Sequence, residues 1–398
     1  MIRRIQRTCV LLALVTGCAH AAMVVRLSEV SDDVKIVLIP GNEACTAGLP
    51  ADVYGDSPGF RKESDRVFLR RLNSEKELGK YLVAARQGGG IYLHLPYFHP
   101  GDSCGDVTFE IEGKRILWDG KSYSGKLRID GRDVFYKSVF FTNESDPDMS
   151  DAAYFDRAIP GPAVRRLKHA FPVISDYYRK DLGVEAVQST SAVVALTHNQ
   201  GKYFGYGGDA LNLIRITYDN PNPLPDDIAD VFSRTYAHEL AHKAQHPSLF
   251  ENPYGRYLTE GSAEFLKLFV LRESGLIDAH QEDGLVRNAL QECAQHNSET
   301  SWLQKLSGHT TFYREPYDCG LVYYIASYRY SGLEAKAFVQ LLLKALSADI
   351  DYSSDRRRLC LLYESDCQNV TITDLVSGGP GFERARAGIE SKKKVGAR

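Results

Sequence analysis

Residues 238–242 read His-Glu-Leu-Ala-His, so two histidines lie four positions apart with a glutamate directly after the first. In an α-helix this spacing puts His238 and His242 about 40° apart around the axis and about 6 Å apart along it. Both imidazoles could then reach one zinc ion at about 2.0–2.1 Å. Glu239 is offset around the same helix, where its carboxylate can face a water molecule held by the metal. The segment therefore predicts a catalytic metal site.

A catalytic zinc site takes three protein ligands. Glu260 is the candidate for the third, and 17 residues separate it from His242. It lies in residues 257–265 (YLTEGSAEF), which are predicted to open a new helix. Glu264 follows four residues later on the same helical face, where it can hold the second ring nitrogen of a zinc-binding histidine. An exposed helix glutamate is the alternative for Glu264.

His246 is a rival ligand, because it lies four residues after His242 and would continue the same stripe of the helix. A metal held between His238 and His242 would leave it a further turn away, about 6 Å along the axis. Pro247 is expected to end the helix at this point. We therefore interpret His246 as a residue that supports the ligands or caps the helix.

The two segments together resemble the gluzincin metallopeptidases, whose signature is HExxH followed by a WLNEGxA-like segment. The two segments are most similar to those of the peptidase-MA-like members. They are also distantly similar to the catalytic domain of M1-type aminopeptidases. The resemblance implies a Zn²⁺-dependent peptidase in which His238, His242 and Glu260 bind the metal. It assigns the general base to Glu239, and to Glu264 a hydrogen bond with a zinc histidine.

Residues 315–320 (EPYDCG) resemble the P-Y-x-x-G segment of gluzincin aminopeptidases. That likeness implies that Tyr317 donates to the developing oxyanion, with Tyr313 as the alternative donor. The aminopeptidase G-x-M-E-N motif, which binds the free amine of the substrate, is absent. We therefore expect an endopeptidase that acts on a peptide or protein substrate. The resemblance covers about residues 164–335 and leaves residues 24–150 unexplained.

The elements around these motifs predict an α+β protein. Residues 23–150 read as a β-rich domain, because apolar and polar residues alternate in short runs between turn signals. One helix is expected at 74–85, where a capping box opens it and the glycines at 88–90 end it. The expected strand segments are 107–111, 116–118, 127–129 and 134–136, with hairpin turns at 112–113, 119–120 and 130–131.

Residues 151–377 are predicted to form a zincin-like catalytic domain, with a small sheet, the HExxH helix and a helical C-terminal lobe. Residues 378–398 are expected to be a flexible tail. The expected elements of the catalytic domain are a helix over 164–182, strands at 192–196 and 211–218, and the HExxH helix, which Asp226 and Asp227 open.

The first 22 residues predict a signal peptide. Three arginines precede the short apolar run CVLLALV, which is too short to cross a bilayer as a helix. Cleavage after Ala21 or Ala22 would leave an exported periplasmic or secreted protein. The alternative is a lipobox reading of residues 15–18, in which Cys18 is lipidated and anchors an outer-membrane lipoprotein.

Export makes the cysteines outside this segment candidates for disulfides. Six remain, and six cysteines allow 15 pairings. Pairing of neighbours in the sequence predicts Cys45–Cys104, Cys293–Cys319 and Cys360–Cys367.

Composition narrows the function classes further. The chain has 398 residues, of which 43% are hydrophobic and 25% charged, as in an ordinary globular protein. The 48 basic residues do not exceed the 51 acidic ones, so no nucleic-acid partner is expected. Two other hypotheses stay open, a non-catalytic zinc-bearing binding protein and a structural lipoprotein of the cell envelope. Glu239 favours the enzyme, because a structural zinc site has no need of a base.

Overall fold

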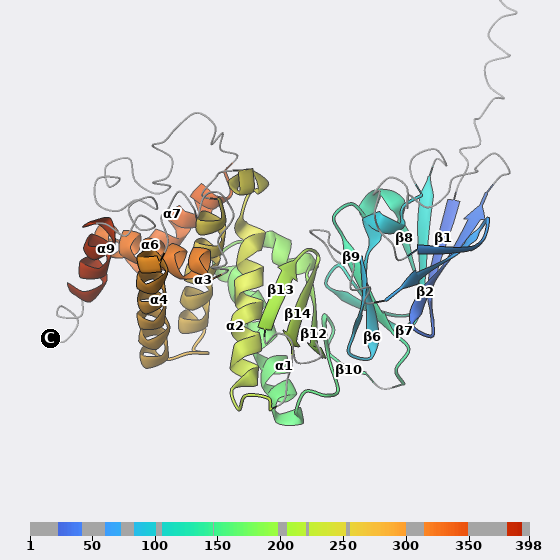
Figure 1. Cartoon of the computed structure of the whole chain (residues 1–398), viewed down its shortest axis with the longest axis horizontal. Coiled ribbons are helices and arrows are strands. Elements are labelled where there is room, and N and C mark those ends of the chain that lie inside the picture. Colours follow the sequence, from blue (N-terminus) through green and yellow to red (C-terminus); the bar gives the residue numbers. More distant parts are fainter. Residues whose placement is uncertain are drawn as a thin grey trace, which may run out of the picture. The chain divides into compact units, whose positions relative to one another are not determined.

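The computed structural model describes residues 23–41, 60–72, 83–100, 106–145, 147–197, 205–219, 223–251, 255–299, 314–348 and 380–391. These residues form a mixed α+β protein, as predicted, with a curled sheet region and a helical region (Figure 1). Their contacts divide the chain into two units. The first runs up to Ala152 and includes Leu211–Leu213, and the second comprises the residues from Ala153 onward without those three. No helix of the described part is long and apolar enough to cross a membrane.

The first unit is built on a nine-stranded sheet. Side chains alternate along β1 (Met23–Val30), so Val25 and Leu27 are fully buried while their neighbours are half-buried. The sheet order is β3-β4-β2-β1-β7-β9-β6-β5, and β8 pairs with β7. Its elements are β1 (Met23–Val30), β2 (Asp33–Pro40), β3 (Phe60–Ser64), β4 (Val67–Arg71), β5 (Ala84–Gln87), β6 (Gly90–His94), η2 (Leu95–Phe98), β7 (Val107–Trp118), β8 (Lys121–Asp130), η4 (Gly131–Asp133) and β9 (Ser138–Thr142).

Local turn chemistry explains one predicted hairpin and fails for another. Asp119 and Gly120 have φ of 45° and 74°, which is the positive-φ pair of a type I′ turn, and they join β7 to β8 as predicted. The turn expected at 112–113 is wrong, because Gly113 lies inside β7. The register with β8 shifts between Gly113 and Ile116, so a bulge absorbs the irregularity and the ladder continues beyond it.

One further expectation for this unit is wrong, and another is tested only at its end. Residues 134–136 are not a strand, because η4 ends the ladder after β8, and Tyr136 is 73% exposed with φ of 57°. The helix expected at 74–85 lies mostly outside the described residues, which omit 73–82. Ala85 belongs instead to β5, and Gly88 turns the chain between β5 and β6.

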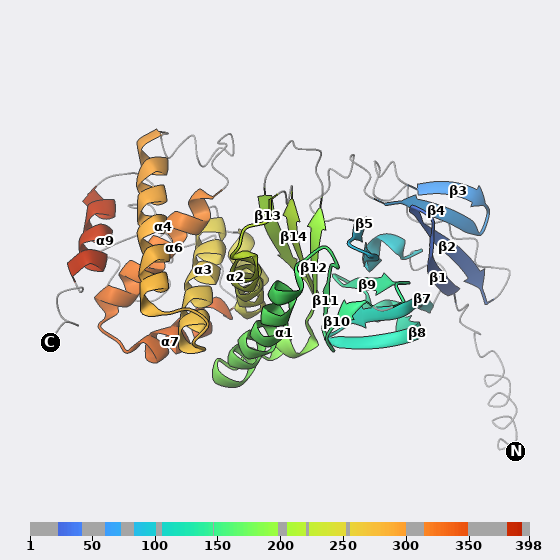
Figure 2. The same cartoon turned by 90° about the horizontal axis from the view of Figure 1, so that it is seen from below.

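The second unit has a five-stranded sheet, and the helices α1 (Gly161–Asp176) and α2 (Ile228–Ala241) lie side by side on one face of it (Figures 1 and 2). The ring of Phe171 in α1 stacks on Tyr236 in α2, with the ring centroids 3.9 Å apart. Tyr178 donates a buried hydrogen bond of 2.8 Å to the carbonyl of Ala237. These contacts fix the helix that carries HExxH against its neighbour.

Five further helices lie on the side of α2 away from the sheet (Figure 2), namely α3 (Gly255–Glu273), α4 (Ala279–Glu299), α6 (Glu315–Ser331), α7 (Ala335–Leu346) and α9 (Pro380–Ser391). The sheet order is β10-β11-β12-β14-β13. The strands are β10 (Asp148–Met149), β11 (Ala153–Phe155), β12 (Ser191–Thr197), β13 (Gly205–Ala210) and β14 (Leu213–Asp219). The short helical elements are η5 (Tyr177–Asp181), η6 (Glu185–Ser189), η7 (His242–Ala244) and η8 (Pro247–Glu251).

The helix and strands predicted around the HExxH segment are present, but the HExxH helix is shorter than expected. The strands expected at 192–196 and 211–218 correspond to β12 and β14, and helical backbone covers the region expected at 164–182. The expectation that Pro247 ends the HExxH helix is wrong, because α2 ends at Ala241 and the 3₁₀ turn η7 follows. His242 is therefore the C-cap residue of α2.

The predicted disulfide Cys293–Cys319 is confirmed and joins α4 to α6 across 26 residues of sequence. The partners in the other two predicted pairs lie outside the described residues, as does the predicted signal peptide. The expectation of a flexible tail over 378–398 is wrong for α9, which buries Phe382, Ala385 and Ile389. The spacing of these three residues gives α9 one apolar face, which packs into the core of the second unit.

Candidate metal centre and active site

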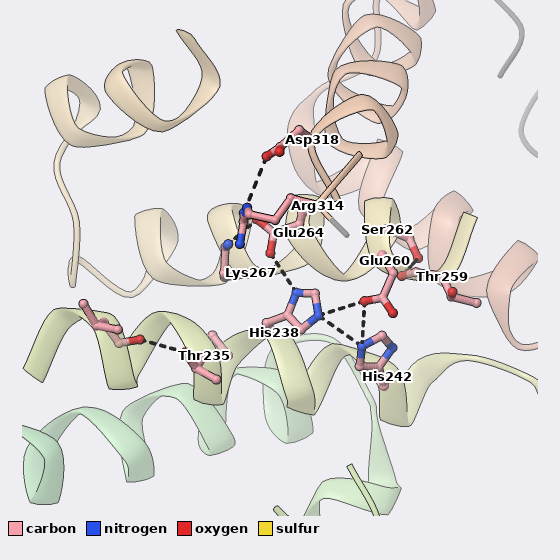
Figure 3. A network of polar contacts seen from close by, with 12 residues as sticks. Thr235, His238, His242, Thr259, Glu260, Ser262, Glu264, Lys267, Arg314 and Asp318 are labelled. Carbon is pink, nitrogen blue, oxygen red and sulfur yellow. Dashed lines mark hydrogen bonds and ion pairs between the residues drawn. The ribbon is translucent and has the colours of Figure 1, made fainter. Parts of the chain in front are cut away.

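The three predicted ligands, His238, His242 and Glu260, meet between α2 and α3 (Figure 3). The Nε2 atoms of His238 and His242 are 3.1 Å apart. Glu260 Oε2 lies 3.2 Å from Nε2 of His238 and 3.5 Å from Nε2 of His242. Two histidines from one helix and a carboxylate from the next therefore aim one atom each at a common point.

The spacing of these atoms fits a tetrahedral metal ion. Ligand bonds of about 2.0–2.1 Å in a tetrahedron place neighbouring donor atoms about 3.4 Å apart. The three observed separations, 3.1, 3.2 and 3.5 Å, surround that value. Two imidazole nitrogens and one carboxylate oxygen are also a ligand set that catalytic zinc takes, with a fourth position left for water or substrate.

Glu264 lies one turn after Glu260 in α3 and contacts the other ring nitrogen of His238. Its Oε1 is 2.9 Å from His238 Nδ1, and its Oε2 accepts a hydrogen bond from Lys267 (Figure 3). Glu264 is 9% exposed, so it is not the exposed helix glutamate of the alternative interpretation. The carboxylate thus faces His238 from the side opposite Glu260.

These carboxylates dominate the electrostatics of the centre. Burial lowers the pKa of His238, but Glu260 and Glu264 outweigh it and raise that pKa to about 9. Burial raises the pKa of Glu260, but hydrogen bonds from His238 and His242 hold it well below its ordinary value. Lys267 and His238 likewise overcome the burial of Glu264 and keep its pKa low. Both carboxylates are therefore ionised at neutral pH, as metal binding and histidine support require.

Glu239 and Tyr317 line one cavity of about 670 Å³ together with His238. Glu239 is only 7% exposed, although it is a charged residue. Tyr317 stacks its ring on the imidazole of His238, with centroids 5.4 Å apart and planes 23° apart. Of the three residues in the ligand cluster, only His238 lines the cavity. The predicted base and the predicted oxyanion donor therefore line the same cavity as one of the candidate ligands, His238.

Several further charged side chains line this cavity among apolar and neutral ones. Arg314 holds its guanidinium carbon 5.5 Å from the centre of the Tyr317 ring, and its Nη2 lies 3.5 Å from Asp318 Oδ1. Arg234, Lys267 and Glu292 also line the cavity. Tyr313, the alternative to Tyr317, lies outside the described residues.

His246 does not join the cluster. Its Nδ1 lies 2.9 Å from the hydroxyl oxygen of Ser248, and its backbone N–H donates to the carbonyl of Leu346. Because α2 ends at Ala241, His246 does not continue the stripe formed by His238 and His242. The interpretation that His246 is not a ligand agrees with this position.

Two residues of the centre were not singled out from the sequence. Lys267 lies three residues after Glu264, a spacing at which side chains of a helix can pair. This ion pair could therefore have been predicted from the sequence. Gln245 lies 2.9 Å from His242 Nδ1 and also reaches α3, where it contacts Thr259 and Ser262. No local spacing predicts those contacts, because Thr259 and Ser262 belong to another helix.

A search with the sequence finds no match among protein-family models and none among curated proteins. The resemblance to gluzincins therefore rests on residues 238–242, 257–265 and 315–320 of this chain.

Proposed function

We propose that this protein is an exported zinc metallopeptidase with a zincin-like catalytic unit, and that it acts as an endopeptidase. The observation that carries the proposal is the convergence of His238, His242 and Glu260 at separations of 3.1–3.5 Å. Glu239 supports it, because a site that only holds a metal has no need of a nearly buried carboxylate beside its ligands. The absent G-x-M-E-N motif favours an endopeptidase over an aminopeptidase.

Each side chain has a distinct part in the proposed reaction. Zinc bound by the three ligands would act as a Lewis acid that polarises the peptide carbonyl and makes water a stronger acid. Glu239 accepts the proton of the attacking water and passes it to the departing amine. Tyr317 donates its phenolic hydrogen to the oxygen that becomes negative in the transition state. Lys267 and Glu264 keep His238 oriented throughout.

The decisive experiment combines metal analysis with one isosteric substitution. The purified mature protein should hold about one zinc per chain, and His238→Ala, His242→Ala or Glu260→Ala should each lose it. Glu239→Gln should keep the metal and the fold but abolish cleavage of a mixed peptide library, because an amide cannot accept the proton of water. His246→Ala is the matched control and should keep both zinc and activity.

The possible outcomes separate the open hypotheses. If His246→Ala loses zinc while Glu260→Ala keeps it, the ligand assignment is wrong. If the protein holds zinc but shows no peptide cleavage that Glu239→Gln abolishes, the non-catalytic zinc-bearing binding protein is favoured. A chain with no zinc would favour the structural lipoprotein.

Export is part of the proposal and has its own test. Mass spectrometry of the N-terminal peptide should show a mature chain that starts at Ala22 or Met23. A diacylglyceryl group on Cys18 would instead make the protein a membrane-anchored lipoprotein.

A further inference from the structure

We propose that Gln245 is a positioning residue that fixes the tautomer and the ring orientation of His242. The inference rests on the proposed metal site and adds to it a residue outside the resemblance. Gln245 Oε1 lies 2.9 Å from His242 Nδ1, and Gln245 Nε2 lies 2.7 Å from the carbonyl oxygen of Thr259 and 2.9 Å from the hydroxyl of Ser262. The amide therefore makes a contact with each of its polar atoms.

The partners of Gln245 determine which way its amide faces. A carbonyl oxygen only accepts hydrogen bonds, so the atom of Gln245 that faces Thr259 must be the NH₂ group. The Ser262 hydroxyl donates to the same carbonyl at 3.1 Å, which leaves its oxygen free to accept from the amide. Thr259 and Ser262 are both fully buried, so water does not offer them an alternative partner. The carbonyl of Gln245 must then face His242.

This orientation assigns the proton on His242. Gln245 Oε1 can only accept, so Nδ1 of His242 must carry the N–H. A neutral imidazole has one such proton, so the lone pair is left on Nε2. That nitrogen is the one that faces His238 and Glu260. The assigned tautomer is therefore the one that a metal ligand at this position requires.

His242 needs this support because of its place in the fold. It is the C-cap residue of α2, and only the short 3₁₀ turn η7 follows it. At Gln245 the backbone becomes extended, with φ of −100° and ψ of 133°, and the side chain returns to α3. Thr259 and Ser262 flank Glu260 in that helix. The amide thus ties a ligand at the end of α2 to the turn of α3 that carries the third ligand.

The test separates the hydrogen bond from the bulk of the side chain. Gln245→Met keeps the length but removes the acceptor and the donors, and Gln245→Glu keeps an acceptor for His242. Zinc affinity is measured by competition with a chromophoric chelator. We expect Gln245→Met to weaken affinity about 10- to 100-fold, as loss of a partner of a ligating histidine does. Gln245→Glu should restore part of it, because it keeps the acceptor for His242 but loses the donor to the Thr259 carbonyl. Gln291→Met, at an exposed position of α4, is the control and should change nothing.

A second readout does not depend on metal. Nitrogen NMR of histidine-labelled, metal-free protein reports which ring nitrogen of His242 carries the proton. The Nδ1–H form should dominate in the wild type and in Gln245→Glu, and Gln245→Met should show a mixture of tautomers. A merely structural role for Gln245 would not produce that pattern.

The outcomes distinguish this inference from the proposed function. Unchanged zinc affinity and an unchanged His242 tautomer in a folded Gln245→Met protein would overturn the role of Gln245 and leave the zinc site intact. A wild type that binds no zinc would contradict the proposed function, while the tautomer measurement would still test Gln245. If Gln245→Met does not fold, a mixture of tautomers in the wild type would overturn the inference.

Discussion

Gly261 of α3 and Gly320 of α6 are in backbone contact. A Cβ atom added to Gly261 would lie 2.5 Å from the Cα of Gly320, and one added to Gly320 would lie 2.6 Å from the Cα of Gly261. Glu260 directly precedes the first glycine, and Tyr317 lies one turn before the second. The helix with the third candidate ligand and the helix with the candidate oxyanion donor therefore cross where neither has a side chain.

We expect Gly261→Ala to damage both stability and metal binding. Alanine favours an isolated helix by about 1 kcal/mol over glycine, but here the methyl group would meet backbone, which cannot rotate away. Overpacking of this kind costs about 1–3 kcal/mol, and moving α3 also moves Glu260. Urea unfolding and chelator competition measure the two effects. A variant with wild-type stability and wild-type zinc affinity would contradict this account.

Gly284→Ala is the matched control for that substitution. Gly284 lies in α4, and an added Cβ would meet only the guanidinium of Arg287 at 3.9 Å. The change should therefore be neutral or stabilise by up to about 1 kcal/mol, because it lowers the entropy of the unfolded chain.

The sequence predicted the three candidate ligands and the supporting Glu264, but not the other residues that hold them in place. His238 and His242 follow from the geometry of one helix, and Glu260 from a second motif. The partners of Gln245 lie 14 and 17 residues away in another helix, so only tertiary structure reveals them. The glycine after Glu260 was visible as part of a motif, but its contact with Gly320 was not.

In the fold, too, features set by local sequence were predictable and features set by tertiary contacts were not. The turn at 119–120 was predictable, because two residues suited to positive φ set it locally. The turn expected at 112–113 failed, because pairing with β8 on both sides outweighs the local signal at Gly113. The expectation of a flexible tail failed at α9, where the spacing of Phe382, Ala385 and Ile389 marks an apolar helical face.

Glu264→Ala should weaken zinc binding about 10- to 100-fold, because it removes the carboxylate beside Nδ1 of His238. Glu264→Gln should be milder, since its amide oxygen can still accept from that nitrogen. Isothermal titration against a competing chelator measures both. Glu273→Ala, near the end of the same helix and outside the ligand cluster, serves as the control. If the wild type and these three variants bind zinc with equal affinity, Glu264 does not support the metal site.

His94 should make the first unit less stable in acid. It is 3% exposed, its Nδ1 lies 3.0 Å from Ser138 Oγ, and burial lowers its pKa to about 4 from an ordinary 6.5. Between these values the unfolded chain binds a proton at His94 and the folded chain does not. Acidification therefore favours unfolding, and stability present above pH 6.5 is lost as the pH falls toward 4, by up to about 3 kcal/mol.

His94→Gln tests this, because glutamine can bond Ser138 but does not titrate. The fluorescence of Trp118 in β7 follows the urea unfolding of this unit, with the second tryptophan, Trp302, replaced by phenylalanine. The loss of stability between pH 6.5 and 4 should be smaller in His94→Gln than in the parent. Parallel stability curves would show that His94 makes no contribution in this range.

Tyr317→Phe should lower kcat while leaving KM, zinc content and stability close to wild type. The ring would still stack on His238, where the centroids are now 5.4 Å apart, so only the phenolic donor is lost. A donor to an oxyanion acts in the transition state and not on bound substrate, so its removal appears in kcat. The loss of one such donor costs about 10²–10³ in kcat. Steady-state kinetics on one peptide from the library measures it, with Tyr313→Phe in parallel.

If Tyr313→Phe lowers kcat and Tyr317→Phe does not, the role belongs to Tyr313. If neither does, a different group stabilises the oxyanion.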